Sequence, residues 1–204
     1  LAYRDEQREA EPGAGPEVVA LADFCARMPV EVRLPFIARM IPRYVTPERI
    51  RRLKSAGLDY VTMGLEASDR VNRTIFNRHE TASSYLTAAQ TILASGVYLS
   101  TDIIIHNPYE TEDDLREMAQ TLNALPRPNW GVVSLALTPF PNTPLYARCV
   151  RDRMLNRFAT DAYDSMLVPS REGGYLTPRF WFLLNTAILP RIPQELGARL
   201  IAAG

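Results

Sequence analysis

Cysteine is scarce in this chain, with only Cys25 and Cys149 among 204 residues. The two cysteines lie far apart and form no Cys-x-x-Cys pair, so the sequence indicates neither a disulfide framework nor a self-contained metal site. Because unpaired, reduced cysteines are the norm in the cytoplasm, a cytoplasmic location is the default that we expect.

The chain also lacks an excess of either charge and a long hydrophobic run. Its 23 lysines and arginines balance 23 aspartates and glutamates, which disfavours nucleic acid or an anionic membrane as a partner. No apolar segment approaches the roughly 20 residues that span a bilayer. The apolar segment 180–189 is short enough to be a core or interface helix. Composition is therefore that of an ordinary globular domain.

Helix and strand signals alternate along most of the sequence. Capping residues and apolar periodicity predict helices over 16–28, 46–56, 81–96 and 111–125, with another beginning at residue 145. Short apolar runs predict strands over 30–37, 58–65, 100–105 and 132–137. Two of the helix–strand junctions have similar sequences, which indicates a repeated unit of about 35 residues, the length of a helix, a strand and two loops.

This order predicts an α/β fold with a parallel sheet. No Gly-x-Gly-x-x-Gly turn follows any strand, so a partial (β/α) barrel fits better than a doubly wound sheet. We expect residues 1–153 to form the barrel part and residues 154–204 a mostly helical C-terminal extension, because the alternation weakens beyond residue 151.

Polar residues follow two neighbouring predicted strands where ligands bind in parallel sheets. Glu66 ends one strand, and Asp102 lies within the next. Two such carboxylates could accept hydrogen bonds from a vicinal diol, and Arg78 could bind a carboxylate through two bonds. A second interpretation stays open, in which Glu66 and Arg78 form only a surface ion pair contributing roughly 0–1 kcal/mol.

Four motifs occur in a fixed order along these elements. They are Gly-Leu-Glu-Ala-Ser at 64–68, Asn-Arg-His at 77–79, Asp-Ile-Ile-Ile-His-Asn-Pro-Tyr-Glu-Thr at 102–111 and Pro-Phe-Pro-Asn-Thr-Pro-Leu-Tyr at 139–146. Together they resemble the radical S-adenosylmethionine (radical SAM) enzymes, most closely the class with an N-terminal cobalamin-binding domain. The resemblance covers roughly residues 1–150 and implies strands two or three to six of a partial TIM-barrel-like fold.

The resemblance also implies roles for individual residues. Glu66 and Asp102 match positions that contact the ribose hydroxyls of S-adenosylmethionine, and Arg78 matches the position that pairs with its methionine carboxylate. Asp5 and Glu6 would lie near the methionyl amino group or the substrate. The adenine would be flanked by Ile104 and the 137–140 turn, which includes Pro139 and Phe140.

The sequence departs from the family at several positions. Arg39 stands where the coproporphyrinogen branch has a glutamate, which argues against that branch. His106 stands where many relatives have glycine; it is either a substrate-side proton donor or an ordinary loop or core histidine. Asn142 replaces the glycine of a Pro-Gly-Thr turn, a mild change because asparagine tolerates a left-handed backbone.

The Cys-x-x-x-Cys-x-x-Cys loop that holds the family's [4Fe–4S] cluster is absent from these residues. Cys25 and Cys149 are instead predicted to be packing residues. The resemblance implies an enzyme that reductively cleaves S-adenosylmethionine to a 5′-deoxyadenosyl radical, for cobalamin-linked methyl transfer or rearrangement on an unactivated carbon of a small molecule. We expect this chain to be an inactive fragment whose missing N-terminal part carries the cluster loop and the cobalamin domain.

Two alternatives come from other classes of protein. One is a non-catalytic barrel remnant that binds a nucleotide-like ligand or a protein partner. The other is an ordinary barrel lyase or aldolase, which is disfavoured because the single lysine, Lys54, falls on a predicted helix and not at a strand end. Since an incomplete barrel exposes strand edges and apolar surface, we also expect the isolated chain to be poorly soluble.

Overall fold

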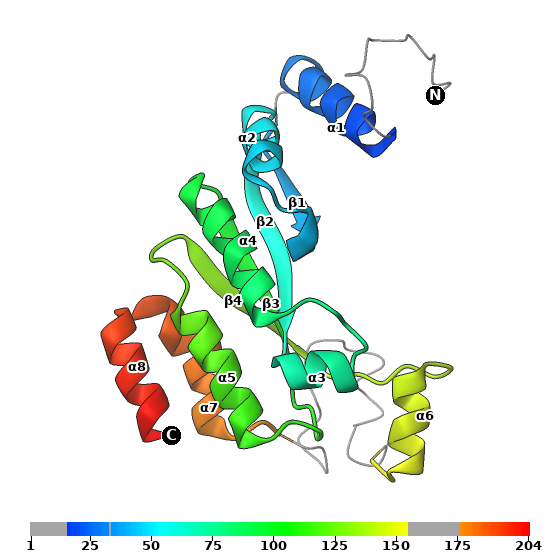
Figure 1. Ribbon diagram of the computed structural model, residues 1–204, viewed down its shortest axis with the longest axis vertical. Helices are drawn as coiled ribbons and strands as arrows, with labels where there is room; N and C mark the ends of the chain where they lie inside the picture. The colour runs from blue at the N-terminus through cyan, green and yellow to red at the C-terminus, as the bar shows by residue number, and fades with distance from the viewer. Residues whose placement is uncertain (1–15, 33, 155–175) are drawn as a thin grey trace.

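A four-stranded parallel sheet forms the centre of the molecule (Figure 1). The computed structural model describes residues 16–32, 34–154 and 176–204. The strands are β1 (Phe36–Met40), β2 (Leu58–Glu66), β3 (Tyr98–Ile105) and β4 (Trp130–Ala136). Each strand pairs with the next one in the sequence, in the order β1-β2-β3-β4. This is the order of an open segment of a parallel βα barrel, so the predicted fold class is confirmed.

Helices cover one face of this sheet, called here the outer face (Figure 1). The longer helices are α1 (Pro16–Arg27), α4 (Ala82–Ala94), α5 (Glu112–Asn123) and α8 (Gln194–Ala203). The shorter ones are α2 (Pro47–Ser55), α3 (Asp69–Thr74), α6 (Pro144–Arg151) and α7 (Arg179–Leu183). Among the described helices, none combines the length and the apolar character needed to cross a bilayer.

The hydrophobic core lies between the outer face and the helices. Alternate residues of β2 and β3 point into it, and Met63, Leu99 and Ile103 are fully buried there. The intervening residues form the opposite face, called here the inner face. It is exposed in part: Ile37 is 67% exposed and Val133 44% exposed, whereas Ser100 of β3 is buried. The outer face of the sheet is thus packed against helices, and part of the inner face is accessible to solvent.

The predicted strand at 30–37 is wrong. Residues Met28–Val32 continue helix α1 as a π-helical turn, and β1 begins only at Phe36. Pro35 has no N–H for a sheet ladder, so pairing starts one residue later, where the Phe36 N–H donates to the Gly57 carbonyl at 3.0 Å. Helix α3, which the sequence did not predict, begins after Ser68, whose side chain accepts from the N–H of Val71.

The C-terminal helices pack against α5 and β4. Trp181, Leu184 and Leu189 are buried in the same core as the sheet, and the Arg116 side chain donates to the Ile201 carbonyl at 2.8 Å. The C-terminal extension expected over 154–204 is helical in its second part, whereas residues 155–175 lie outside the described residues. The division after residue 153 stays a prediction.

A buried carboxylate joins the loops that follow β2 and β3. Asp114, in the first turn of α5, accepts hydrogen bonds from the Ser68 hydroxyl at 2.6 Å and from the Arg70 guanidinium. It also accepts from the N–H and hydroxyl of Thr111, at 2.7 and 2.6 Å. Burial alone would raise the pKa of Asp114, but these hydrogen bonds outweigh burial and hold the pKa well below its usual range.

Glu110, in the same loop, has the opposite environment. Its side chain is buried, and neither carboxyl oxygen has a hydrogen-bond partner among the described residues. Burial and, to a smaller extent, the charge of Asp114 raise the pKa of Glu110, Arg70 opposes both, and the resulting pKa is about 8. The carboxyl group is therefore mostly protonated at neutral pH.

Replacing Glu110 by glutamine should make the protein less sensitive to alkaline pH. The unfolded side chain titrates near 4.5 and the folded one near 8, so the native carboxyl contributes stability at low pH that is lost as pH rises between these values. We compare the free energy of unfolding of Glu110→Gln with that of the wild type at two pH values. The difference, variant minus wild type, should be roughly 2–4 kcal/mol larger at pH 8 than at pH 5. Urea denaturation at the two pH values measures this difference.

The matched control for this experiment is Glu195→Gln, because Glu195 is exposed on α8. Its pH profile should follow that of the wild type. Parallel profiles for Glu110→Gln and the wild type would show that Glu110 titrates normally.

Candidate functional site

Two acids and two arginines lie on the inner face near the carboxyl ends of β1, β2 and β3. We call Arg39, Glu66, Arg78 and Asp102 the strand-end cluster. Asp102 of β3 is in register with Gly64 of β2, and Glu66 ends β2 one step further along. Arg39 of β1 acts electrostatically on both acids. The structure therefore brings together the three residues predicted from the strand ends, and adds Arg39.

The backbone of β2 sets the position of the Glu66 carboxylate. The register shifts between Gly64 and Glu66, and Glu66 has a φ of 65°, in the left-handed region that non-glycine residues seldom adopt. This bulge turns the side chain back over the strand, where a Cβ on residue 64 would overlap the Glu66 carboxylate. Gly64 is thus required so that Glu66 can lie beside Asp102.

Asn72 of α3 holds the turn that follows Glu66. Its side-chain amide donates to the carbonyls of Leu65 and Ala67, both at 3.0 Å, and the residue is almost completely buried. Because it satisfies two buried carbonyls, the turn is held on both sides of Glu66.

Arg78 pairs with Glu66 across the cluster, with 3.2 Å between Nη1 and Oε1. The ion pair that the sequence left open as an alternative is therefore present, and both side chains are largely buried, at 29% and 16% exposed. The Arg78 Nε is buried and has no hydrogen-bond partner in the described part of the chain. The guanidinium thus keeps a donor available, and its role toward a ligand stays a prediction.

Both acids of the cluster are ready to accept hydrogen bonds. Burial raises the pKa of Glu66, Arg78 lowers it, the charge of Asp102 raises it, and Arg39 lowers it. Burial likewise raises the pKa of Asp102, with Arg39 acting in the opposite direction. Donors such as hydroxyl groups would replace solvent lost by the two carboxylates, so the cluster suits a neutral diol.

His106, at the end of β3, is held by the C-terminal segment. Its backbone N–H donates to the Thr177 hydroxyl at 2.7 Å, and the Thr177 N–H donates to His106 Nδ1 at 3.0 Å. The ring stacks on Phe182 with 5.9 Å between centroids, and burial lowers the pKa of His106. These contacts favour the structural interpretation of His106 over a proton donor.

The other predicted cofactor neighbours are spread around the cluster. Ile104 lies on the inner face, half-buried, one inward-facing position after Asp102. Pro139 is buried and Phe140 is 48% exposed in the loop between β4 and α6. Asp5 and Glu6 lie outside the described residues.

The described residues do not fit an iron–sulfur cluster. They contain no group of three or more histidine, cysteine, aspartate or glutamate side chains that could hold a metal ion. Cys25 is half-buried on α1, and Cys149 is buried on α6, where the Tyr109 hydroxyl reaches its sulfur at 3.7 Å. Both are packing residues, as the sequence predicted.

Several contributors to the site were missed at the sequence level. Asp114 carried only the signal of a capping residue three positions after Thr111, although it also joins the two loops. Glu110 carried no signal other than its place in the Asn-Pro-Tyr-Glu-Thr motif, and Asn72 carried none. Their roles depend on burial and on partners more than 40 positions away or in an unpredicted helix, which the local pattern does not reveal.

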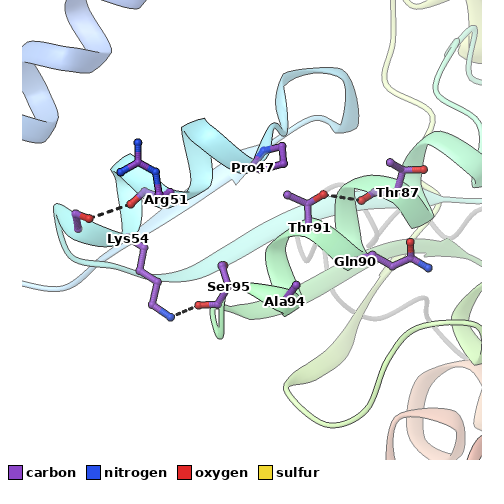
Figure 2. Close-up of a pocket in the computed structure, with 9 residues that line it drawn as sticks. Pro47, Arg51, Lys54, Thr87, Gln90, Thr91, Ala94 and Ser95 are labelled. Atoms are coloured by element: carbon purple, nitrogen blue, oxygen red, sulfur yellow. Dashed lines mark hydrogen bonds between the residues drawn. The ribbon is translucent and has the colours of Figure 1, made fainter.

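A separate groove of about 850 Å³ lies on the outer layer between α2 and α4 (Figure 2). Lys54 closes one end by donating to the Ser95 carbonyl, and Thr87 and Thr91 line the α4 side. No carboxylate lines this groove, and none of the strand-end cluster reaches it. This groove is therefore not the candidate site.

Comparison with solved structures identifies the same fold. The chain is similar to the radical S-adenosylmethionine methyltransferase TsrM from Kitasatospora setae with tryptophan substrate and a SAM analogue bound (19% identity, 68% of this chain and 28% of that chain, TM-score 0.55). TsrM with cobalamin and a [4Fe-4S] cluster bound matches at 18% identity, over 74% and 32% of the chains, with a TM-score of 0.55. Elp3 from Methanocaldococcus infernus matches at 16% identity, over 58% and 28%, with a TM-score of 0.48.

The structural similarity covers only part of these longer proteins. The chain spans less than a third of the length of TsrM. No curated protein matches the sequence. The family model of the Radical SAM superfamily, however, matches residues 10–122, which is more than half of the chain. This chain therefore belongs to the radical SAM superfamily.

Proposed function

We propose that three members of the strand-end cluster, Glu66, Arg78 and Asp102, bind S-adenosylmethionine. The observation that carries this proposal is the meeting of Glu66 and Asp102, from neighbouring strands, on one open face with Arg78 beside them. Two carboxylates side by side suit the two hydroxyls of a ribose, because each hydroxyl donates one hydrogen bond and adds no charge.

Each residue has a distinct binding role in this proposal. Glu66 and Asp102 accept from the ribose hydroxyls, and Arg78 exchanges part of its ion pair with Glu66 for the methionine carboxylate, using its unpartnered Nε as a further donor. Ile104, Pro139 and Phe140 flank the adenine. Asp5 and Glu6 lie near the methionyl amino group or the substrate.

The complete protein is, in this proposal, an enzyme that uses a [4Fe–4S] cluster and cobalamin. Such a cluster, held by residues other than those described here, would supply the electron that cleaves S-adenosylmethionine to a 5′-deoxyadenosyl radical. Cluster ligands and a cobalamin-binding domain come from residues beyond these 204, so this chain alone is inactive. Support for cobalamin comes from the sequence resemblance and from the likeness in fold to TsrM, a methyltransferase that holds cobalamin.

Methyl transfer or rearrangement on an unactivated carbon of a small molecule is the reaction that we propose. The residues of this chain bind and orient the cofactor: the acids fix the ribose, and the arginine fixes the amino-acid end. Two fixed ends leave the bond between sulfur and the 5′ carbon in one orientation, which is what a positioning site contributes to a cofactor-driven reaction.

A non-catalytic protein is the second candidate, favoured by the lack of a cluster-binding group in the described residues. Iron and sulfide reconstitution of the complete protein distinguishes the two. An electron paramagnetic resonance signal of a reduced [4Fe–4S] cluster supports the enzyme. Iron content at background supports the barrel remnant.

Asp102→Ala in the complete protein should weaken binding of S-adenosylhomocysteine about tenfold or more. The variant removes hydrogen bonds between a carboxylate and the ribose, which contribute roughly 1.5–3 kcal/mol. Isothermal titration calorimetry measures the affinity. Asp59→Ala is the control, because Asp59 is an exposed acid at the opposite end of a neighbouring strand. An unchanged affinity for Asp102→Ala would remove the proposal.

Gly64→Ala should weaken the same ligand without unfolding the protein. The new methyl group occupies the place of the Glu66 carboxylate, a flexible group that can move away. We expect a loss of about tenfold in affinity, comparable to losing one charged hydrogen bond. Circular dichroism during heating checks the fold. If Gly64→Ala binds as tightly as the wild type, Glu66 does not contact the ligand from this position.

A further inference from the structure

Arg39 differs from the other arginine of the strand-end cluster because it has no hydrogen-bond or ion-pair partner among the described residues. Its side chain is exposed on the inner face, and no ion pair or hydrogen bond connects it to any described residue. Its charge lowers the pKa of Glu66 and of Asp102, so it lies near both acids without contacting them. Arg78, in contrast, is paired with Glu66.

The inner face changes character along the strands at this point. Arg39 is in register with Thr62 of β2, one inward-facing position before Gly64 and Asp102. The preceding inward-facing position, about 7 Å away along the strands, holds Tyr60 and Tyr98. Arg39 therefore lies between the acidic cluster and an aromatic surface.

The two tyrosines form a flat apolar surface. Their rings stack with 5.1 Å between centroids and an interplanar angle of 18°. The Tyr98 hydroxyl lies over Gly131 of β4, where a Cβ would be 2.5 Å from it, so the ring fits because residue 131 has no side chain. Ile37 beside them is exposed, Tyr98 is 39% exposed and Tyr60 is half-buried, so part of this surface is accessible to a ligand.

Charge balance shows which ligand group Arg39 suits. The cluster has two carboxylates and two guanidiniums, which sum to zero. A ribose brings no charge to the acids, and a methionine carboxylate satisfies Arg78. Arg39 is then the one cation of the cluster without an anion in contact, and a guanidinium binds carboxylate or phosphate through two parallel hydrogen bonds.

We propose that Arg39 binds the anionic group of the substrate, a carboxylate or phosphate, while the apolar body of that substrate lies on Tyr60 and Tyr98. The inference rests on the proposed function, because it places the substrate beside the cofactor. It adds the chemical class of the substrate, an organic anion with an apolar or aromatic body.

Benzoate and benzamide test this inference in the complete protein, because they share one shape and differ in charge. Titration by ligand-observed nuclear magnetic resonance, with saturating S-adenosylhomocysteine, should show benzoate binding at least tenfold tighter than benzamide. Arg39→Gln should reduce this preference below twofold and leave the affinity for S-adenosylhomocysteine within twofold of the wild type. Arg39→Lys, which keeps the charge but loses the fork, should retain an intermediate preference.

Arg199→Gln is the control, since Arg199 is an exposed arginine on α8, and it should bind both probes like the wild type. Equal binding of benzoate by Arg39→Gln and the wild type would overturn the inference. A variant that loses S-adenosylhomocysteine and keeps benzoate would also overturn it, because Arg39 would then belong to the cofactor site.

The two proposals fail separately. If the wild type does not bind S-adenosylhomocysteine, the proposed function fails, yet the benzoate preference and its loss in Arg39→Gln can be measured without that ligand. If Asp102→Ala weakens S-adenosylhomocysteine while Arg39→Gln changes no benzoate affinity, the proposed function stands and the inference falls.

Discussion

The buried carboxylate of Asp114 fixes the geometry of the candidate site although it does not line it. It accepts from Ser68, two residues after Glu66, and from Thr111, in the loop that follows β3. Asp114 therefore joins the two loops through direct hydrogen bonds. Hydrogen bonds to a charged group contribute roughly 1.5–3 kcal/mol each, and a charge left buried without them is costly, so this connection is strong and specific.

The chain leaves the sheet in a similar way after both strands. Glu66 has a φ of 65° and His106 a φ of 59°, each at or just beyond a strand end. Such a backbone costs of order 1 kcal/mol at a non-glycine residue and persists only where neighbours hold it. Asn72 holds the first turn through two carbonyls, and Thr177 holds the second through backbone and ring. Strain at both strand ends is thus balanced by buried polar contacts.

Much of the fold could be predicted because its local signals agree with its tertiary contacts. Thr46, Thr81 and Thr111 cap their helices as expected, and the β–α order dictated the parallel sheet. The strand at 30–37 failed because its apolar residues suit either a helix continuation or a strand. Only the pairing of Phe36 with β2 decides between them.

For the candidate site, the sequence predicted which residues lie close together but not the geometry of their side chains. Parallel strands place their carboxyl ends together, so the proximity of Glu66 and Asp102 followed from topology. The ion pair between Glu66 and Arg78 was one of two open interpretations, and its burial was not predicted. The bulge at Glu66 and the neutral state of Glu110 did not follow from topology either, because both depend on side-chain direction and burial set by distant residues. Local sequence patterns do not predict those contacts.

The inner face has the composition of a ligand-binding wall and not that of a core. A core would bury its apolar residues, whereas Ile37 and Val133 are exposed here beside charged groups. Leaving such surface in water costs about 25 cal/mol per Å², so covering it with a ligand or with other parts of the protein is favourable. The acids lie toward one end of this face and the stacked tyrosines toward the other. In the proposed arrangement, two ligands would therefore lie side by side along the strands in one order, with a ribose at the acids and an apolar group at the tyrosines.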